Sequence, residues 1–275
     1  MLRPSISRVR SALLTVLVAG LFLLAGCGGG GGGNGQDVQL QKGERSPTIE
    51  GANALITAPA DTAVLDSANV MVTVDADSFE TGVQTETDRA EEIANSGNGQ
   101  HFHLILDNQP YMANYEAGEP FDIGELEPGA HTLVAFPSRS YHESVKSDTS
   151  YDHINFYVQE ESGDFMLNPD DPAIIYSRPK GTYSGAGAEK IMLDFYLHNV
   201  DLSSDGYKAK YTIRSGGSEV ASITLTEWTP AFVTGLSSGT YEVTLQLLDA
   251  DGNVVPGSFN DTTREITVET GEGGA

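Results

Sequence analysis

The sequence contains only one cysteine among its 275 residues. Because a disulfide needs two thiols, none can form within the chain, and the folded part must be stabilised by burying apolar surface. Methionine is also scarce, with five residues, and the sequence lacks the methionine clusters whose thioether sulfurs suit Cu(I). The first absence excludes a disulfide scaffold, and the second argues against a Cu(I) carrier.

Basic residues are few: 15 lysines and arginines stand against 39 aspartates and glutamates, for a net charge of −24. Such a surface repels the phosphates of nucleic acid and gains nothing from anionic lipid headgroups. We therefore expect no nucleic-acid partner and no attachment to a membrane through charge. An acidic surface keeps a protein soluble or hydrated in high salt, and it also favours cation binding. Charge alone does not distinguish these interpretations.

Signals of catalysis are weak. Ser138, Ser140 and Ser144 do not sit in the strand-to-helix turn that exposes a nucleophilic serine. Paired catalytic carboxylates cannot be recognised against so acidic a background. Residues 249–253 resemble the start of a calcium loop but lack the bidentate acid further on, so a hairpin turn is predicted there. We expect that the protein is not an enzyme.

The N-terminal residues have the pattern of an export signal. Arg3, Arg8 and Arg10 precede an apolar run over residues 12–24, which is too short to span a bilayer comfortably. A Leu-Ala-Gly-Cys motif then ends at Cys27, the single cysteine. No other segment of the sequence approaches the length of a membrane span.

This combination resembles the signal of bacterial lipoproteins. The resemblance implies that residues 1–26 are removed, that the Cys27 thiol is diacylated, and that residues 27–49 form a lipidated, flexible, glycine-rich tether. The mature chain would keep 12 basic and 39 acidic residues, for a net charge near −27. It would lie in the cell envelope, lipid-anchored and extracytoplasmic. Gly28, where some lipoproteins carry an inner-membrane retention aspartate, favours the outer membrane in a two-membrane cell. The alternative is an ordinary secretory signal with a chance cysteine.

Beyond the tether the sequence predicts strands. β-branched and apolar runs bounded by turn residues occupy residues 70–74, 101–107, 132–136, 154–158, 191–197, 207–214, 219–225, 241–248 and 264–269. Only residues 88–95 suggest a helix, and they are few. The predicted fold class is all-β, with a first domain over residues 50–160, an acidic linker over 161–172 and a second domain over 173–270.

The two halves share a motif. Residues 126–133 (LEPGAHTL) align with residues 236–243 (LSSGTYEV). Leu-x-x-Gly-x-Tyr before an alternating strand resembles the corner at the start of strand F in immunoglobulin-like sandwiches, where the tyrosine hydroxyl bonds back to the preceding loop. The resemblance implies two tandem immunoglobulin-like β-sandwiches, with Tyr241 at the corner of the second and a structural His131 in its place in the first.

A histidine pair lies on the second of these predicted strands, residues 101–107, which we place at strand C of the first sandwich. The strand alternates, so Phe102 faces the core while His101 and His103 face outward, roughly 6.6 Å apart along the strand. That spacing suits two ligands of one metal ion. Strand C lies antiparallel to strand F in this fold, so we expect His142, just after strand F, to reach the same end.

Imidazole suits Cu(II), Zn(II) or Ni(II). Residues 99–145 are also similar to small, largely uncharacterised envelope domains that contain a His-x-His-Leu strand and a later Gly-x-His-Thr-Leu segment. The resemblance carries over His101, His103 and His142 as candidate ligands of copper or zinc. The alternative is that the three are exposed histidines without a metal.

The remaining candidate residues are not predicted to bind the metal. His153 and the acidic loop over residues 79–100 are predicted at the same tip as the three histidines, whereas His198 is expected to be unrelated. The basic stretch 178–181 is predicted as a loop near the start of the second domain. Trp228 is expected to pack in the core or at a sheet edge rather than to stack on a sugar.

The sequence as a whole favours a non-enzymatic envelope lipoprotein with a binding or structural role. Its expected partners are the membrane, through the lipid anchor, and an envelope protein or a glycan. One alternative is a divalent-metal protein that uses the three histidines. A second is a metal-dependent hydrolase, which would need an acid such as Glu143 as its base.

Overall fold

The computed structural model describes residues 37–147 and 149–271. The expected signal, Cys27 and the run of glycines lie outside these residues. Within them strands dominate, and the two helices, α1 (Arg89–Glu92) and α2 (Ala186–Glu189), are four residues each. No helix in the described part is long and apolar enough to cross a membrane. The predicted all-β fold class is confirmed, and the short helix expected over residues 88–95 is α1.

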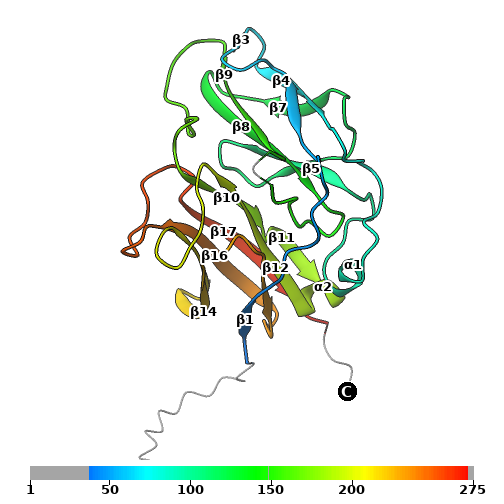
Figure 1. The fold of residues 1–275 in the computed structure, drawn as a ribbon, viewed down its shortest axis with the longest axis vertical. Coiled ribbons are helices and arrows are strands. Elements are labelled where there is room, and N and C mark those ends of the chain that lie inside the picture. The colour runs from blue at the N-terminus through cyan, green and yellow to red at the C-terminus, as the bar shows by residue number, and fades with distance from the viewer. Residues whose placement is uncertain (1–36, 148, 272–275) are drawn as a thin grey trace, which may run out of the picture. The chain divides into compact units, whose positions relative to one another are not determined.

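The first β-sandwich consists of two sheets with a shared core (Figure 1). One sheet has the strand order β2-β4-β7, and the other has the order β3-β9-β8-β5-β6. Neighbouring strands are antiparallel except β3, which runs parallel to β9. The strand bounds are β2 Leu55–Ala58, β3 Val64–Leu65, β4 Asn69–Asp75, β5 His101–Leu106, β6 Met112–Asn114, β7 Phe121–Glu125, β8 Gly129–Ser138 and β9 Asp152–Val158.

The second sandwich repeats this arrangement strand for strand. Its own strands have the orders β15-β12-β10 and β11-β17-β16-β13-β14, and β11 is again parallel to β17. Strand β1 (Gln39–Lys42) extends the first of these sheets beyond β15. The strand bounds are β10 Ala173–Arg178, β11 Gly181–Ser184, β12 Lys190–His198, β13 Lys208–Ser215, β14 Ser218–Leu225, β15 Ala231–Thr234, β16 Gly239–Leu248 and β17 Asp261–Glu269. The tandem immunoglobulin-like architecture follows from this repetition.

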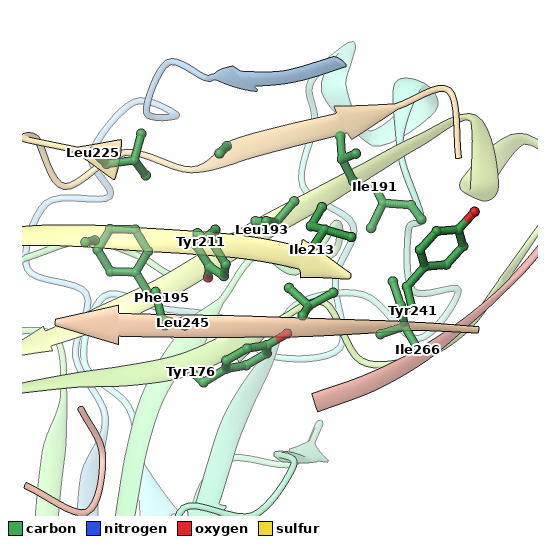
Figure 2. Close-up of a cluster of buried hydrophobic side chains, with 14 of the residues drawn as sticks. Tyr176, Ile191, Leu193, Phe195, Tyr211, Ile213, Leu225, Tyr241, Leu245 and Ile266 are labelled. Atoms are coloured by element: carbon green, nitrogen blue, oxygen red, sulfur yellow. The ribbon is translucent and has the colours of Figure 1, made fainter. Parts of the chain in front are cut away.

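Alternating apolar residues fill the core of each sandwich. In the second sandwich Leu193 and Phe195 of β12 meet Tyr211 and Ile213 of β13, and Figure 2 shows these side chains gathered between the sheets. All four side chains are fully excluded from solvent. Burying a large apolar side chain contributes about 1.5–3 kcal/mol relative to leaving it exposed, so this core can hold the sandwich together without a disulfide.

The predicted corner motifs are confirmed in both sandwiches. The Tyr241 hydroxyl donates to the carbonyl oxygen of Ser237 at 3.0 Å. In the first sandwich His131 takes the same part, because its Nε2 donates to the carbonyl of Glu127 at 2.8 Å and its Nδ1 lies 2.6 Å from the Asp107 carboxylate. Each side chain thus bonds four residues back along the chain.

The second corner also contains a match to a catalytic sequence motif. Residues 235–239 (GLSSG) fit the Gly-x-Ser-x-Gly pattern of a nucleophilic serine. In the structure, however, this segment joins β15 to β16, so it is a strand-to-strand connection rather than a strand-to-helix turn. Both the hydroxyl and the carbonyl of Ser237 contact the Tyr241 hydroxyl. The match therefore belongs to the corner and not to a catalytic elbow.

The expected flexible tether over residues 27–49 is wrong for its last part. Residues Gln39–Lys42 form strand β1, which pairs antiparallel with β15 of the second sandwich. Further along, the backbone N–H of Ser46 donates to the Glu143 carboxylate of the first sandwich at 2.8 Å. Such alternating polar residues extend a sheet edge because backbone pairing needs no apolar side chain. The segment after β1 is therefore a strap that contacts both sandwiches.

The two sandwiches also pack against each other. A separate apolar cluster joins Ile105, Val134 and Phe136 of the first sandwich to Ile175 and Tyr196 of the second. The described residues accordingly fall in one compact unit. Residues 161–172, predicted as an acidic linker, contribute to the same cluster, because Leu167 is buried in it.

A buried ion pair lies near this cluster. Lys146 of the first sandwich contacts the carboxylate of Asp194 on β12 of the second, and both side chains are almost fully excluded from solvent. The backbone N–H of Ser144 donates to the other Asp194 oxygen at 3.0 Å. A buried charge is tolerated only where a partner and hydrogen bonds compensate its lost hydration, and Asp194 has both.

Candidate metal centre

The three predicted ligands, His101, His103 and His142, come together in the structure. His101 and His103 lie two residues apart on β5, and His101 pairs with Ser138 at the end of β8. The loop after β8 turns back at once, because the backbone N–H of His142 donates to the Arg139 carbonyl at 2.8 Å. His142 itself has a φ of 69°, a conformation that non-glycine residues adopt rarely and that recurs at functional sites.

The ring nitrogens of the three histidines converge on one point. Nε2 of His101 lies 3.1 Å from Nε2 of His103 and 3.2 Å from Nδ1 of His142. One ligand atom from each ring lies within 4.8 Å of the other two. A tetrahedral metal ion with bonds of about 2.0–2.1 Å separates its nitrogen ligands by about 3.3 Å, so the measured distances suit a shared metal.

Hydrogen bonds fix which nitrogen of His101 is free. Its Nδ1 lies 2.8 Å from the carbonyl oxygen of Gly99. Since a carbonyl only accepts, Nδ1 carries the proton and Nε2 of the neutral ring presents a lone pair. The ring of His103 is held by the Ser177 hydroxyl, 3.0 Å from its Nδ1, and this hydroxyl can either donate or accept. In metal-binding histidines, a hydrogen bond at the ring nitrogen that does not bind the metal typically fixes the ring orientation and the tautomer.

All three rings are held in the neutral form. Burial lowers the pKa of His101 to about 4, against a partial opposing effect of the Gly99 carbonyl. Burial likewise holds the pKa of His103 and of His142 well below the usual range, and the charge of Arg178 acts in the same direction on both. Neutral imidazole is the form that binds metals, so no proton has to be displaced at neutral pH.

The prediction that His101 and His103 face solvent is wrong. Both side chains are fully buried. Their face of β5 also carries Ile105, which belongs to the apolar cluster between the sandwiches. The second sandwich therefore covers the side of β5 opposite the core, and it supplies Ser177 at the end of β10 to His103. The site lies at a junction rather than on an exposed tip.

Aromatic rings pack around the three histidines. The Tyr111 ring stacks on His103, with 3.5 Å between centroids and 9° between planes. The Tyr115 ring lies 4.8 Å from that of His101. Burial raises the pKa of Tyr111 to about 12, which keeps its hydroxyl protonated 3.4 Å from Nδ1 of His142. These rings exclude water from two sides of the cluster.

Two cations of the second sandwich stand close to Tyr111. Lys180 Nζ lies 4.1 Å from the centre of the Tyr111 ring and donates to the Tyr111 carbonyl at 2.6 Å. The Arg178 guanidinium carbon lies 5.8 Å from the same ring centre. The sequence predicts residues 178–181 only as a basic loop. Their role was missed because nothing in the local sequence shows which part of the first sandwich they contact.

A cavity opens beside the cluster. It has a volume of about 430 Å³, and its lining includes His142, Arg178 and Tyr183. His142 is also the only one of the three histidines that is not fully buried in the described structure. The cavity therefore gives solvent or a small ligand a route to His142, the most exposed of the three histidines.

His153 does not join the three histidines, contrary to the prediction. It lies on β9, and its ring stands 4.9 Å from that of His198 on β12. The Tyr151 hydroxyl bonds to Nδ1 of His198. His198, expected to be unrelated to the three histidines, does not belong to their group, and it contacts the first sandwich at a second place along the junction.

Acidic residues of the 79–100 loop stay apart from the histidine cluster. Among the described residues, the group with metal-ligand spacing consists of three histidines without a carboxylate. Glu92 instead forms an ion pair with Lys190 at 2.7 Å. What the loop does supply is the Gly99 carbonyl that holds His101.

Glu143, the base that a hydrolase would need, is engaged elsewhere. One carboxylate oxygen accepts from the Ser46 backbone, and the other accepts from the Ser46 hydroxyl and from Arg89 at 2.7 Å. Burial by itself raises the pKa of Glu143, but the charge of Lys146 and the Ser46 hydrogen bonds outweigh it, so the pKa lies below its ordinary value. Because both of its oxygens already accept hydrogen bonds, the Glu143 carboxylate holds the strap against the first sandwich.

Two further sequence expectations match the structure. The Asp249 side chain accepts from the backbone N–H of Asn253 at 2.8 Å, which closes the predicted turn without a calcium loop. Trp228 donates from its ring nitrogen to the Phe195 carbonyl at 3.0 Å, and the Arg45 guanidinium lies over its ring. Its face is thus occupied, as expected for packing at a sheet edge.

Comparisons with known proteins give only distant likenesses. No protein-family model and no curated protein matches the sequence. Similar solved structures include fibronectin(III)-like modules of Clostridium thermocellum CbhA, 12% identical, with 79% of this chain and 94% of that chain covered and a TM-score of 0.27. A Bacteroides ovatus glucan-utilization protein, SGBP-B, in complex with a mixed-linkage heptasaccharide is 13% identical, with coverage of 79% and 70% and a TM-score of 0.24.

Dimeric latent PorU from Porphyromonas gingivalis is 14% identical, with a TM-score of 0.25. The match covers 80% of this chain but only 20% of PorU, so this chain spans about a fifth of that protein. TM-scores this low describe poor whole-chain superpositions. Because one fold hosts many functions, nothing about binding or activity follows from these likenesses.

Proposed function

We propose that the protein is a cell-envelope lipoprotein, anchored through Cys27, that binds one divalent transition-metal ion through His101, His103 and His142. The role is binding rather than catalysis. The observation that carries the proposal is the lone pair on Nε2 of His101, which faces two other ring nitrogens at 3.1 and 3.2 Å. One lone pair cannot accept two good hydrogen bonds, whereas one metal ion can accept a lone pair from each of the three nitrogens.

The donor set favours copper(II) or zinc. Imidazole nitrogen suits both ions, and an all-nitrogen set without thiolate or thioether does not favour Cu(I). Three protein ligands leave one coordination position open, as in zinc sites that exchange a ligand. Metal-dependent hydrolysis would need a base beside that position, and both oxygens of Glu143 are already bound by Ser46 and Arg89.

The test is metal uptake by a fragment of residues 36–275, which holds the whole compact unit. The fragment is dialysed against limiting copper or zinc, and bound metal is measured by elemental analysis. We expect one ion per chain, and less than about a tenth of that for His101→Gln/His103→Gln because two of three ligands are lost. The matched control, His153→Gln/His198→Gln, removes two other junction histidines and should keep full uptake.

Equal uptake by both double variants, or no stoichiometric uptake by the unmodified fragment, would overturn the metal proposal. The protein would then be a binding module for an envelope protein or a glycan. The anchor is tested separately in cells, by labelling with a fatty-acid analogue. Label on the full chain and its loss in Cys27→Ser support lipidation, and label retained in Cys27→Ser contradicts it.

A further inference from the structure

The charges around the three histidines are unbalanced. Three neutral imidazoles would hold a divalent cation without adding negative charge. The nearest charged groups on the second sandwich, Arg178 and Lys180, are both cationic and both stand over the Tyr111 ring that stacks on His103. No carboxylate belongs to the histidine group among the described residues. A bound metal would therefore add positive charge to a site that is already positive.

Arg178 is held rigidly at this place. Its side chain is buried, one guanidinium nitrogen donates to the Tyr183 hydroxyl at 3.1 Å, and the guanidinium carbon lies 5.6 Å from the Tyr183 ring centre. The Tyr211 hydroxyl donates to the Arg178 carbonyl at 3.1 Å. A guanidinium has five N–H donors in a planar fork that matches the oxygens of an anion.

In the described part of the chain, access to the histidine cluster is through the cavity beside His142. Tyr111 and Tyr115 cover the rings of His103 and His101, and the Gly99 carbonyl occupies the far nitrogen of His101. The cavity of about 430 Å³ is lined by both His142 and Arg178. A ligand that enters it meets the open side of the metal site and the guanidinium together.

We infer that the metal takes a small inorganic anion as its fourth ligand, admitted through this cavity and stabilised by Arg178 and Lys180. The inference rests on the proposed metal site and adds the chemical class of its exchangeable ligand. An anion is favoured over water because it neutralises both the metal and the two side-chain cations in a partly desolvated place, where charge interactions are strong.

The experiment uses the copper(II)-loaded fragment of residues 36–275 and azide as the anion probe. Azide bound to copper(II) gives a charge-transfer absorption, which reports its dissociation constant. We expect saturable binding by the unmodified fragment and affinity about tenfold weaker in Arg178→Gln, since a nearby charge and its donors are lost. Lys180→Gln, at a half-buried position, provides a second variant should Arg178→Gln fail to fold, and we expect weaker azide binding there too.

The control is Lys42→Gln, which removes an exposed lysine on β1 that pairs with Glu227 at 3.1 Å. It changes the net charge by the same amount and should leave azide affinity unchanged. Full copper content with no azide band, or affinities in Arg178→Gln and Lys180→Gln equal to that of the control, overturns the anion inference alone. Loss of copper binding by the unmodified fragment instead overturns the proposed metal site itself.

Discussion

The Nε2 atoms of His101 and His103 lie 3.1 Å apart, although the hydrogen bond from Nδ1 of His101 to Gly99 leaves Nε2 of that ring without a proton. The backbone of β5 holds alternate residues on one face, and the second sandwich closes over them. The two rings are therefore fixed by parts of the chain that do not depend on a metal. A site whose ligands lie on a strand and are oriented by hydrogen bonds to Gly99 and Ser177 is organised before its metal binds.

Zinc should stabilise the folded protein measurably. A ligand that binds only the folded state adds about 2.7 kcal/mol to the free energy of unfolding when its concentration is 100 times Kd. We expect the thermal midpoint of the 36–275 fragment to rise with zinc concentration, as followed by circular dichroism. His101→Gln should show no rise, whereas His153→Gln should respond like the unmodified fragment.

Without metal, the protein should lose stability in mild acid. The pKa of His101 is about 4 in the folded state and near 6.5 when unfolded. Below pH 6.5 the unfolded chain binds a proton that the folded chain refuses, so the free energy of unfolding falls as the pH drops towards 4. From His101 alone we expect a loss of about 2 kcal/mol between pH 7 and pH 5.

Urea denaturation of the metal-free fragment at these two pH values measures this effect. His101→Gln removes the titrating group, so the difference between pH 7 and pH 5 should shrink while other groups still titrate in both proteins. Equal differences in the two proteins would show that the His101 ring is protonated in the fold and would contradict this account.

Ser177 should act on metal affinity across the junction. Its hydroxyl is 3.0 Å from Nδ1 of His103, on the side of the ring away from the proposed metal. Loss of such a contact typically weakens metal binding 10- to 100-fold. We expect Ser177→Ala to weaken zinc binding by about tenfold in a competition titration with a chromophoric chelator. Ser222→Ala, on the exposed face of β14, is the control and should leave the affinity unchanged.

The sequence was sufficient for the architecture because its signals are local. Alternating strands and the two corner motifs depend on residues a few positions apart, and Tyr241 and His131 both make the expected bond to the preceding loop. The three histidines were also predictable, since the antiparallel pairing of strands C and F brings His142 to the start of β5.

The packing of the second sandwich over the three histidines was not predictable in the same way. Alternation assigns His101 and His103 to one face of a strand but does not say what packs on that face. Ser177 contacts His103 across 74 residues of chain, and Arg178 follows Ser177, through packing that no local pattern encodes. One signal was available: Ile105 lies on the histidine face, and residues 133–136 are apolar on both faces, as in strands buried on both sides.

Removing one partner of the buried ion pair between the sandwiches should lower the free energy of unfolding more than removing both partners. Lys146→Met leaves the Asp194 carboxylate buried without its cation, at an expected cost of about 3–5 kcal/mol in the free energy of unfolding. Lys146→Met/Asp194→Leu removes both charges and should recover most of that loss. Urea denaturation of the two variants measures the difference, and a double variant as unstable as the single one would contradict the stated role of the pair.

The most direct test of the metal site is X-ray absorption spectroscopy of the copper- or zinc-loaded fragment of residues 36–275. We expect one ion per chain with three imidazole nitrogens at about 2.0 Å and one further light ligand. His101→Gln/His103→Gln should lose the imidazole scattering. A first shell of oxygens without imidazole scattering, or the same spectrum from the double variant, would contradict the claim that these histidines bind the metal.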